Sequence, residues 1–209
     1  MSYPSKVTRV YLIDDDEQVR KGLTRLLISA GYAVDSFPSA EEFLKTSITQ
    51  PGCILLDVCM TGMTGLDLQN ELKSKGLALP IVFLTGNGDV SMSVTAMKRG
   101  AINFLTKPVD DEVLIEAIQE GLDYLQQTHE DQDKIAFVKS CASSLTEREY
   151  EIMRYVISGA LNKQVAMQLS ISEKTVKVHR GRVMEKMYVD SVAELVRMCE
   201  AAGIEPIRI

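Results

Sequence analysis

The chain has 209 residues, of which 45% are hydrophobic and 25% are charged. This length allows one or two globular domains, and the 13 glycines and 6 prolines are too few for a collagen-like or low-complexity chain. We expect no membrane helix, which needs roughly 18 uncharged apolar residues, and no signal peptide. The four cysteines lack paired spacing, which disfavours a disulfide or zinc framework and favours a reducing cytoplasm.

Charge is distributed unevenly along the chain. Residues 1–140 carry 13 Lys and Arg against 20 Asp and Glu, a net charge of −7, and residues 141–209 carry 10 against 9, a net charge of +1. Residues 174–186 alone hold five basic side chains and one acidic side chain. The contrast predicts two domains with different partners, and nucleic acid is the candidate partner of the second.

Five short apolar runs in the first part of the chain predict strands. They are Val10–Ile13, Ala33–Phe37, Cys53–Leu56, Ile81–Leu84 and Ile102–Leu105. Four are nearly continuous, which is typical of parallel strands covered on both faces, whereas Ala33–Phe37 alternates and fits an edge. Apolar stripes of helical period separate them, including one formed by Val90, Val94 and Met97. These βα units predict an α/β fold with a doubly wound, five-stranded parallel sheet of order 2-1-3-4-5, spanning residues 1–127.

The remaining residues predict only helices. Residues 128–144 are polar and lack Gly and Pro, so we expect a helical linker between the domains. In residues 145–209, Thr146 and Ser191 begin capping boxes, and Asn162 and Ser172 are expected N-caps. A tight connection joins the second and third of these helices, which predicts a small all-α helix-turn-helix domain.

Polar side chains follow the predicted strands at their carboxyl ends. They are Asp14, Asp15, Asp16, Asp57, Thr85 and Lys107. In an open parallel sheet of this order, the ends of the first and third strands are neighbours, so these groups should converge. Clustered carboxylates need a cation, and oxygen ligands suit Mg²⁺. A carboxylate beside Mg²⁺, a lysine and a hydroxyl can accept a phosphoryl group. In the alternative interpretation, these are helix-capping, turn and solvated loop residues.

These segments resemble the receiver domain of two-component response regulators, and residues 90–108 are similar to the FixJ branch. The resemblance rests on the segments Ile13–Glu17, Leu56–Gly65, Leu84–Gly86 and Lys107–Pro108. It implies that Asp57 is the phosphoacceptor for a sensor histidine kinase. It also implies that Mg²⁺ is bound by Asp15, Asp57 and the Cys59 backbone carbonyl, with Asp14 acting through water. Lys107 would pair with phosphoryl oxygens, Thr85 would be the switch hydroxyl, and Phe104 the aromatic that turns inward.

The loop after Asp57 departs from the family pattern. Thr61 stands where relatives carry proline, which frees a backbone angle, adds an N–H and predicts a looser loop. Cys59 and Asn87 occupy positions that tune dephosphorylation in the family, so the lifetime of the phosphoryl group stays open. A small structural thiol is the preferred interpretation of Cys59 over a redox role.

The predicted helix Glu173–Met187 sorts into two faces. Val176, Val183 and Met187 should face the core. The opposite side carries Lys174, Lys177, Val178, Gly181, Arg182 and Glu185, where Lys and Val can approach base edges. Arg180, Arg182 and Lys186, further round and along the helix, are expected to contact phosphates. The alternative is an ordinary solvated face.

Residues 145–197 strongly resemble the LuxR-type helix-turn-helix of FixJ/NarL regulators. The resemblance implies base reading at Lys177, Val178 and Gly181. It also implies dimer contacts from the final helix, for which Leu195, Met198 and Cys199 are candidates.

The leading hypothesis is a phosphorylation-controlled transcription factor of the cytoplasm, without catalytic residues. Phosphorylation should remodel the surface formed by the predicted helix 89–99 and the fifth strand, and drive a homodimer onto a pseudo-palindromic promoter site, with RNA polymerase as a further partner. One alternative is an aspartyl-phosphate enzyme, but hydrolases of the haloacid dehalogenase type need an acid where Cys59 stands. Another is a DNA-binding protein whose receiver binds partners without phosphorylation.

Overall fold

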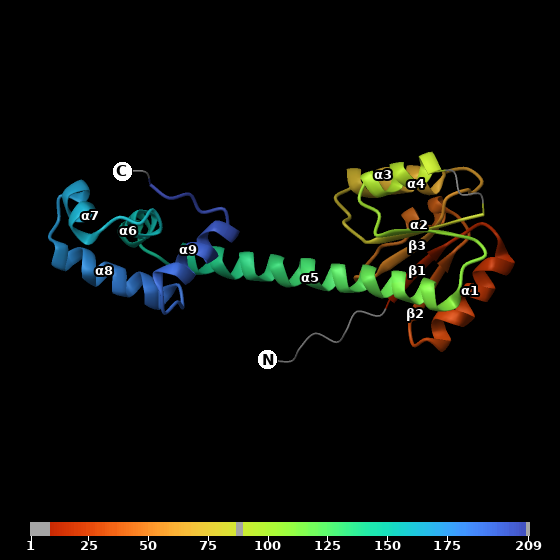
Figure 1. The fold of residues 1–209 in the computed structure, drawn as a ribbon, viewed down its shortest axis with the longest axis horizontal. Helices are drawn as coiled ribbons and strands as arrows, with labels where there is room; N and C mark the ends of the chain where they lie inside the picture. The colour runs from red at the N-terminus through yellow and green to blue at the C-terminus, as the bar shows by residue number, and fades with distance from the viewer. Residues whose placement is uncertain (1–8, 87–89, 208–209) are drawn as a thin grey trace. The chain divides into compact units, whose positions relative to one another are not determined.

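The computed structural model describes residues 9–86 and 90–207, and the chain divides into two compact units, residues 1–128 and 129–209. The first unit combines a parallel sheet with helices, and the described residues of the second unit form helices and their connections (Figure 1). Among the described residues, no helix has the length and apolar character needed to cross a membrane.

The sheet of the first unit has five parallel strands in the order β2-β1-β3-β4-β5. They are β1 (Arg9–Ile13), β2 (Ala33–Phe37), β3 (Cys53–Asp57), β4 (Ile81–Thr85) and β5 (Asn103–Thr106). The predicted fold and strand order are confirmed, and β2 lies at an edge as its alternating pattern predicted. Strand boundaries differ from the predicted ones by at most one residue, which is the ordinary uncertainty of such ends.

Helices cover both faces of this sheet (Figure 1). They are α1 (Glu17–Ser29), α2 (Ala40–Lys45), α3 (Gly65–Ser74), α4 (Val90–Lys98) and the first part of α5 (Asp111–Ser143). Because successive strand residues point to opposite faces, Tyr11 and Ile13 of β1 join a core with α2, α3 and α4, and Val10 and Leu12 join a core with α1 and α5. Burial on both faces explains the nearly continuous apolar runs.

The apolar stripe predicted for α4 does not face the core. Val90 is 76% exposed and Val94 and Met97 are 46% exposed, whereas Ala96 is fully buried. The Ala96 carbonyl accepts a hydrogen bond from the buried Gln69 side chain of α3 at 3.2 Å. The helix therefore approaches its neighbour through a small residue and leaves its larger apolar side chains in solvent. Periodicity identified the stripe, but it does not indicate whether the stripe faces the core or solvent.

Helix α5 contributes to both units. Its residues Leu114, Ile118 and Leu122 belong to a core of the first unit, and Val138 and Cys141 belong to the core of the second. Residues 128–143 are thus part of one helix of 33 residues. The core of the second unit begins before residue 145, where we had predicted its domain to start.

The second unit continues with four helices. They are α6 (Glu147–Ile157), α7 (Asn162–Leu169), α8 (Glu173–Lys186) and α9 (Val192–Ala201). Thr146, Ser172 and Ser191 are the N-caps of α6, α8 and α9, as predicted. The N-cap of α7 is Leu161 rather than Asn162, and the Leu161 N–H donates to the Gln164 side chain at 2.8 Å. A glutamine at the third helical position thus replaces the missing polar cap.

Candidate functional site

The predicted strand-end residues gather at the carboxyl edge of the sheet. Asp14 follows β1, Asp57 ends β3 and Thr85 ends β4. All three residues are almost fully buried, at 1%, 4% and 0% exposure. Because β1 and β3 are paired, and the chain winds in opposite directions from them, Asp14 and Asp57 lie at the switch point of the sheet.

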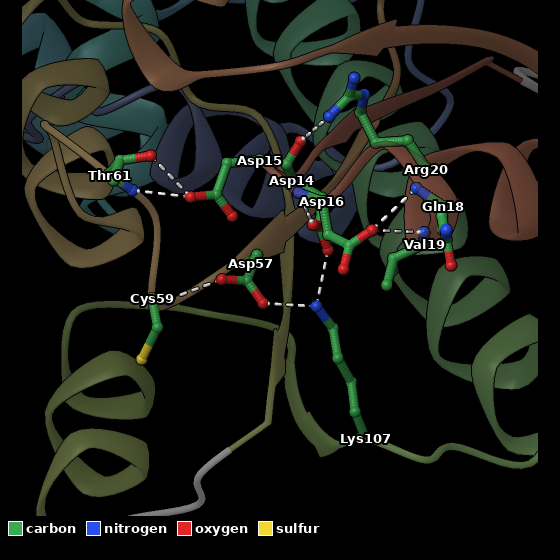
Figure 2. A network of polar contacts seen from close by, with 10 residues as sticks. All are labelled: Asp14, Asp15, Asp16, Gln18, Val19, Arg20, Asp57, Cys59, Thr61 and Lys107. Atoms are coloured by element: carbon green, nitrogen blue, oxygen red, sulfur yellow. Dashed lines mark hydrogen bonds and ion pairs between the residues drawn. The ribbon is translucent and has the colours of Figure 1, made fainter.

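The three successive aspartates have different tasks. Asp16 is the N-cap of α1, and its carboxylate accepts from the backbone N–H groups of Gln18 and Val19 at 2.7 and 3.1 Å (Figure 2). Helix capping, which we considered as the alternative for all three aspartates, therefore holds for this one. The cap leaves Asp14 and Asp15 at the edge of the sheet, where they surround Asp57.

Lys107 joins two of the carboxylates. Its ammonium Nζ lies 2.6 Å from Asp14 Oδ2 and 2.6 Å from Asp57 Oδ1 (Figure 2). Its backbone N–H also donates to the Thr85 carbonyl at 2.7 Å, so the ends of β4 and β5 are tied together. Burial alone lowers the pKa of the lysine, but the bonds and charges of the two aspartates together outweigh it and raise this pKa.

The carboxylates outnumber the cation. Burial raises the pKa of the Asp57 carboxyl, Asp14 raises it further, and the bonds from Lys107 and from the Cys59 N–H, 2.7 Å from Oδ2, offset only part of this. Asp14, Asp15 and Asp57 against Lys107 leave two negative charges. Among the described residues, no group of three His, Cys, Asp or Glu side chains is arranged to hold a metal ion by itself. The excess carboxylate charge favours a bound cation, and Mg²⁺, which prefers oxygen ligands and keeps several of its waters, fits these side chains.

Asp15 is held from the loop that follows β3. One of its oxygens, Oδ2, accepts from the Thr61 N–H at 2.9 Å and from the Thr61 hydroxyl at 2.7 Å (Figure 2). These two bonds lower the pKa of the carboxyl. The N–H that the absence of proline adds is thus engaged, whereas we had expected the change to loosen the loop.

Phe104 lies on β5 beside the core. It is partly buried, and its ring centroid lies 6.1 Å from that of the buried Phe83. Thr85 and Phe104 lie on the adjacent strands β4 and β5. Asn87, which we expected to influence phosphoryl lifetime, and Asp89, the expected first residue of the fourth helix, lie outside the described residues.

In the second unit, α7 and α8 form the helix-turn-helix. Ser170 ends α7 in a left-handed conformation with φ of 50°, and Ser172 caps α8 two residues later. The predicted core face is confirmed, since Val176, Val183 and Met187 are at most 1% exposed. The connection therefore fixes which face of α8 points outward.

Most of the expected DNA contacts lie on the exposed face of α8. Lys174, Lys177, Val178, Gly181 and Arg182 are exposed. A Cβ added at Gly181 would meet no heavy atom within 4 Å, so the centre of this face is open. Close approach of a helix to a base edge requires this kind of surface.

Two other expected contacts are occupied within the unit. Arg180 donates to the Asn162 side chain of α7 at 2.9 Å. Lys186 Nζ lies 2.7 Å from Glu149 Oε2 of α6, and Glu149 is 2% exposed. The structure thus places Lys186 in the packing of the unit, away from the group of free basic side chains.

Two family matches correspond to the two units. Residues 10–119 match the family described as response regulator receiver domain, and residues 143–199 match the bacterial regulatory proteins of the luxR family. The chain belongs to the response regulators. Its second domain is of the LuxR DNA-binding type.

Relatives share this two-domain arrangement over most of their length. The response regulator protein TodT of Pseudomonas putida is 43% identical over 192 residues, which cover 91% of this chain and 85% of TodT. The transcriptional regulatory protein FixJ of Rhizobium meliloti is 39% identical over 94% of this chain and 97% of FixJ. The solved structure of the response regulator StyR is 43% identical, with a TM-score of 0.78 over 92% of this chain and 98% of StyR. This protein is therefore a two-component response regulator with a DNA-binding output.

The dimer contacts expected on the last helix of the response regulator need correction. Leu195 and Cys199 are fully buried in the core of the second unit, and only Met198 of the three candidates is partly exposed. The apolar period of α9 reflects its packing within the unit. Helical period alone does not distinguish packing within a chain from packing between chains.

Two contacts of the response regulator were not foreseen from its sequence. Thr61 binds Asp15 across 46 positions, and Lys186 binds Glu149 across 37. The capping box of Thr146 and Glu149 did indicate that Glu149 lies at a helix start. No local pattern indicated either partner.

Proposed function

We propose that Asp57 accepts a phosphoryl group from the phosphohistidine of a sensor kinase, and that this raises the affinity of the α8 face for promoter DNA. The observation that carries the proposal is the contact of Lys107 with both Asp14 and Asp57 at the switch point of the sheet. In the transfer, an Asp57 oxygen attacks phosphorus while the donor P–N bond breaks and its electron pair leaves with the imidazole. Asp57 acts as the nucleophile.

The other residues of the edge fit supporting roles. Asp15, Asp57 and the Cys59 carbonyl would hold Mg²⁺ directly and Asp14 would hold it through water, and the ion would supply positive charge to the transferred oxygens. Lys107 can move from Asp14 to a phosphoryl oxygen, because its ammonium already bridges two acceptors. Thr85 moves to donate a hydrogen bond to the phosphoryl group. Phe104 then turns into the space that Thr85 leaves.

The surface that responds includes α4 and the edge strand β5. Val90, Val94 and Met97 form an exposed apolar stripe on α4, and such patches often mark interaction sites. We propose that phosphorylation adjusts this surface so that two receivers pair through it. Pairing places two α8 helices on a roughly two-fold symmetric site, which converts a weak half-site contact into tight binding.

On DNA, the free basic side chains of α8 have two tasks. Lys177 and Val178 contact base edges beside Gly181, while Lys174 and Arg182 contact phosphates. Arg180 and Lys186 hold the helix in place through Asn162 and Glu149. The protein acts in the cytoplasm, where its free cysteines stay reduced, and RNA polymerase is the further partner at the promoter.

The test begins with intact mass of the full chain after treatment with acetyl phosphate and Mg²⁺. Wild type should gain one phosphoryl group and Asp57→Asn none. Asp123→Asn, at an exposed aspartate of α5, serves as the matched control and should be labelled like wild type. An unlabelled wild type, with candidate kinases also supplied, would favour a receiver that binds partners without phosphorylation.

DNA binding is then compared on sites selected from a random pool with the phosphorylated protein. Phosphorylated wild type should bind as a dimer, and about 6–10 phosphate contacts should cost about 10³–10⁵ in affinity between ~50 and ~200 mM salt. Val94→Asp should prevent pairing, whereas Ile28→Asp, at an exposed apolar residue of α1, should not. Equal dimerisation of all three proteins would exclude the α4 surface.

A further inference from the structure

The loop between β3 and α3 is tied to the rest of the edge at several points. The Cys59 N–H donates to Asp57, both Thr61 donors reach Asp15, and the Met63 N–H donates to Glu41 Oε1 of α2 at 2.9 Å. The Gly65 N–H closes the loop onto the Val58 carbonyl at 3.1 Å. Carboxylates from three different elements therefore determine where this loop lies.

Thr61 makes the contact between this loop and the segment that follows β1. Its N–H and its hydroxyl converge on the same oxygen of Asp15, at 2.9 and 2.7 Å. Two donors on one oxygen fix both the position and the rotation of the carboxylate. Proline, which stands here in the receivers that this sequence resembles, has neither donor.

The second oxygen of Asp15 receives neither of the two Thr61 bonds, which both go to Oδ2. Figure 2 shows it directed away from Thr61, on the side where Asp14 and Asp57 lie. Thr61 therefore does not occupy the part of the carboxylate that faces the other two aspartates. A residue that competed with a cation would instead bind the inward oxygen.

We infer that Thr61 is a positioning residue that presents Asp15 to Mg²⁺. The inference rests on the proposed function, in which Asp15 is a direct ligand. Partners that orient a ligating carboxylate commonly change metal affinity by about 10–100-fold when they are removed.

The test is a Mg²⁺ titration of the full, unphosphorylated chain, followed by the amide ¹H–¹⁵N shifts of residues 15, 57 and 59. Thr61→Val keeps the N–H and the side-chain shape but loses the hydroxyl, and should weaken Mg²⁺ binding about tenfold. Thr61→Pro loses both donors and should weaken it at least as much. Thr61→Ser, the matched control, keeps both donors and should bind Mg²⁺ like wild type.

A double-mutant cycle separates positioning from a general effect on the fold. In the Asp15→Asn background, Thr61→Val should leave the remaining Mg²⁺ affinity unchanged, because the residue acts through Asp15. Thermal unfolding without Mg²⁺ verifies that each variant is folded at the titration temperature. If Thr61→Val fails this check, the comparison of Thr61→Ser and Thr61→Pro with wild type decides the matter.

Three outcomes are distinguishable. Weaker binding by Thr61→Val, abolished in the Asp15→Asn background, supports the inference. Unchanged or tighter Mg²⁺ binding by folded Thr61→Val and Thr61→Pro overturns it, while leaving the proposed phosphoacceptor role intact. A wild-type chain whose edge residues do not respond to Mg²⁺ overturns the metal site of the proposed function and this inference together.

Discussion

In both the receiver unit and the DNA-binding unit, a lysine contacts buried carboxylate, but the two sites differ in net charge. In the receiver unit, Lys107 is shared between Asp14 and Asp57, and Asp15 adds a third carboxylate nearby. In the DNA-binding unit, Lys186 pairs with one carboxylate, that of Glu149, and also donates to the Ser144 carbonyl at 3.3 Å. The first arrangement retains excess negative charge and the second does not.

The pKa directions follow this difference. Glu149 also accepts the Thr146 N–H at 3.0 Å, and the bond from Lys186, followed by that N–H, lowers its pKa to about 2. Burial and Asp14 raise the pKa of Asp57. A matched, fully hydrogen-bonded pair stabilises the fold, whereas an unmatched cluster holds repulsion that a cation can relieve. The edge proposed to react and the structural pair can therefore be distinguished by charge balance.

The largest expected effect comes from breaking the matched pair. Lys186→Met leaves Glu149 buried without its cation, and should lower the free energy of unfolding of the DNA-binding unit by about 3 kcal/mol. Urea unfolding followed by hydrogen exchange of peptides from each unit measures it. Lys163→Met, at an exposed lysine of α7, is the control and should change stability little. Equal effects of the two variants would contradict a structural role for the pair.

Acid should weaken the same pair in a defined range. Because the folded pKa of Glu149 is about 2 and its ordinary value is 4.5, its contribution is complete above about pH 4.5 and is lost as the pH falls toward 2. The difference in unfolding free energy between wild type and Glu149→Gln isolates this contribution from other carboxyls. We expect about 2 kcal/mol at pH 7, reduced because Lys186 is 36% exposed, and a value near zero at pH 2. A pH-independent difference would contradict the assignment.

The strands and the strand-end residues were predictable because their signals are local. A run such as Cys53–Leu56 is buried on both faces, and Asp57 follows it directly. The sheet order then brings Asp14, Asp57 and Lys107 together without further information. The resemblance to receivers supplied the roles, which spacing alone left open.

Contacts between distant residues were not predictable in this way. Which side of α4 is covered depends on the small Ala96 and on Gln69 of another helix, and period alone does not reveal this. The resemblance implied that Leu195 and Cys199 make dimer contacts, yet both are buried in the core of their own unit. From the sequence, Thr61 was interpreted only as the replacement of a proline. Its bonds to Asp15 were not predictable, because the two residues are 46 positions apart.

Whereas Lys186→Met should destabilise its unit, a mutation in the carboxylate cluster of the receiver unit should stabilise it. Asp57→Asn removes one of the crowded carboxylates, and should raise the free energy of unfolding of the receiver unit by roughly 1 kcal/mol in the absence of Mg²⁺. Since the pKa of Asp57 is raised in the folded state, the gain should shrink as the pH falls through that pKa. Hydrogen exchange in chelator measures it, and a loss of stability would refute the idea of an unrelieved cluster.

The smallest expected effect tests whether one residue of the DNA-binding unit, Gly181, lowers the stability of the unit while allowing it to bind DNA. Gly181 lies inside α8, is exposed, and would carry a Cβ without any contact within 4 Å. Gly181→Ala should therefore raise the unfolding free energy of this unit by up to about 0.8 kcal/mol, through helix propensity alone. The same methyl group lies at the centre of the proposed DNA face and should weaken binding to the selected site. If Gly181→Ala stabilises the unit and binds DNA as wild type does, close approach of the helix to the bases at this position is excluded.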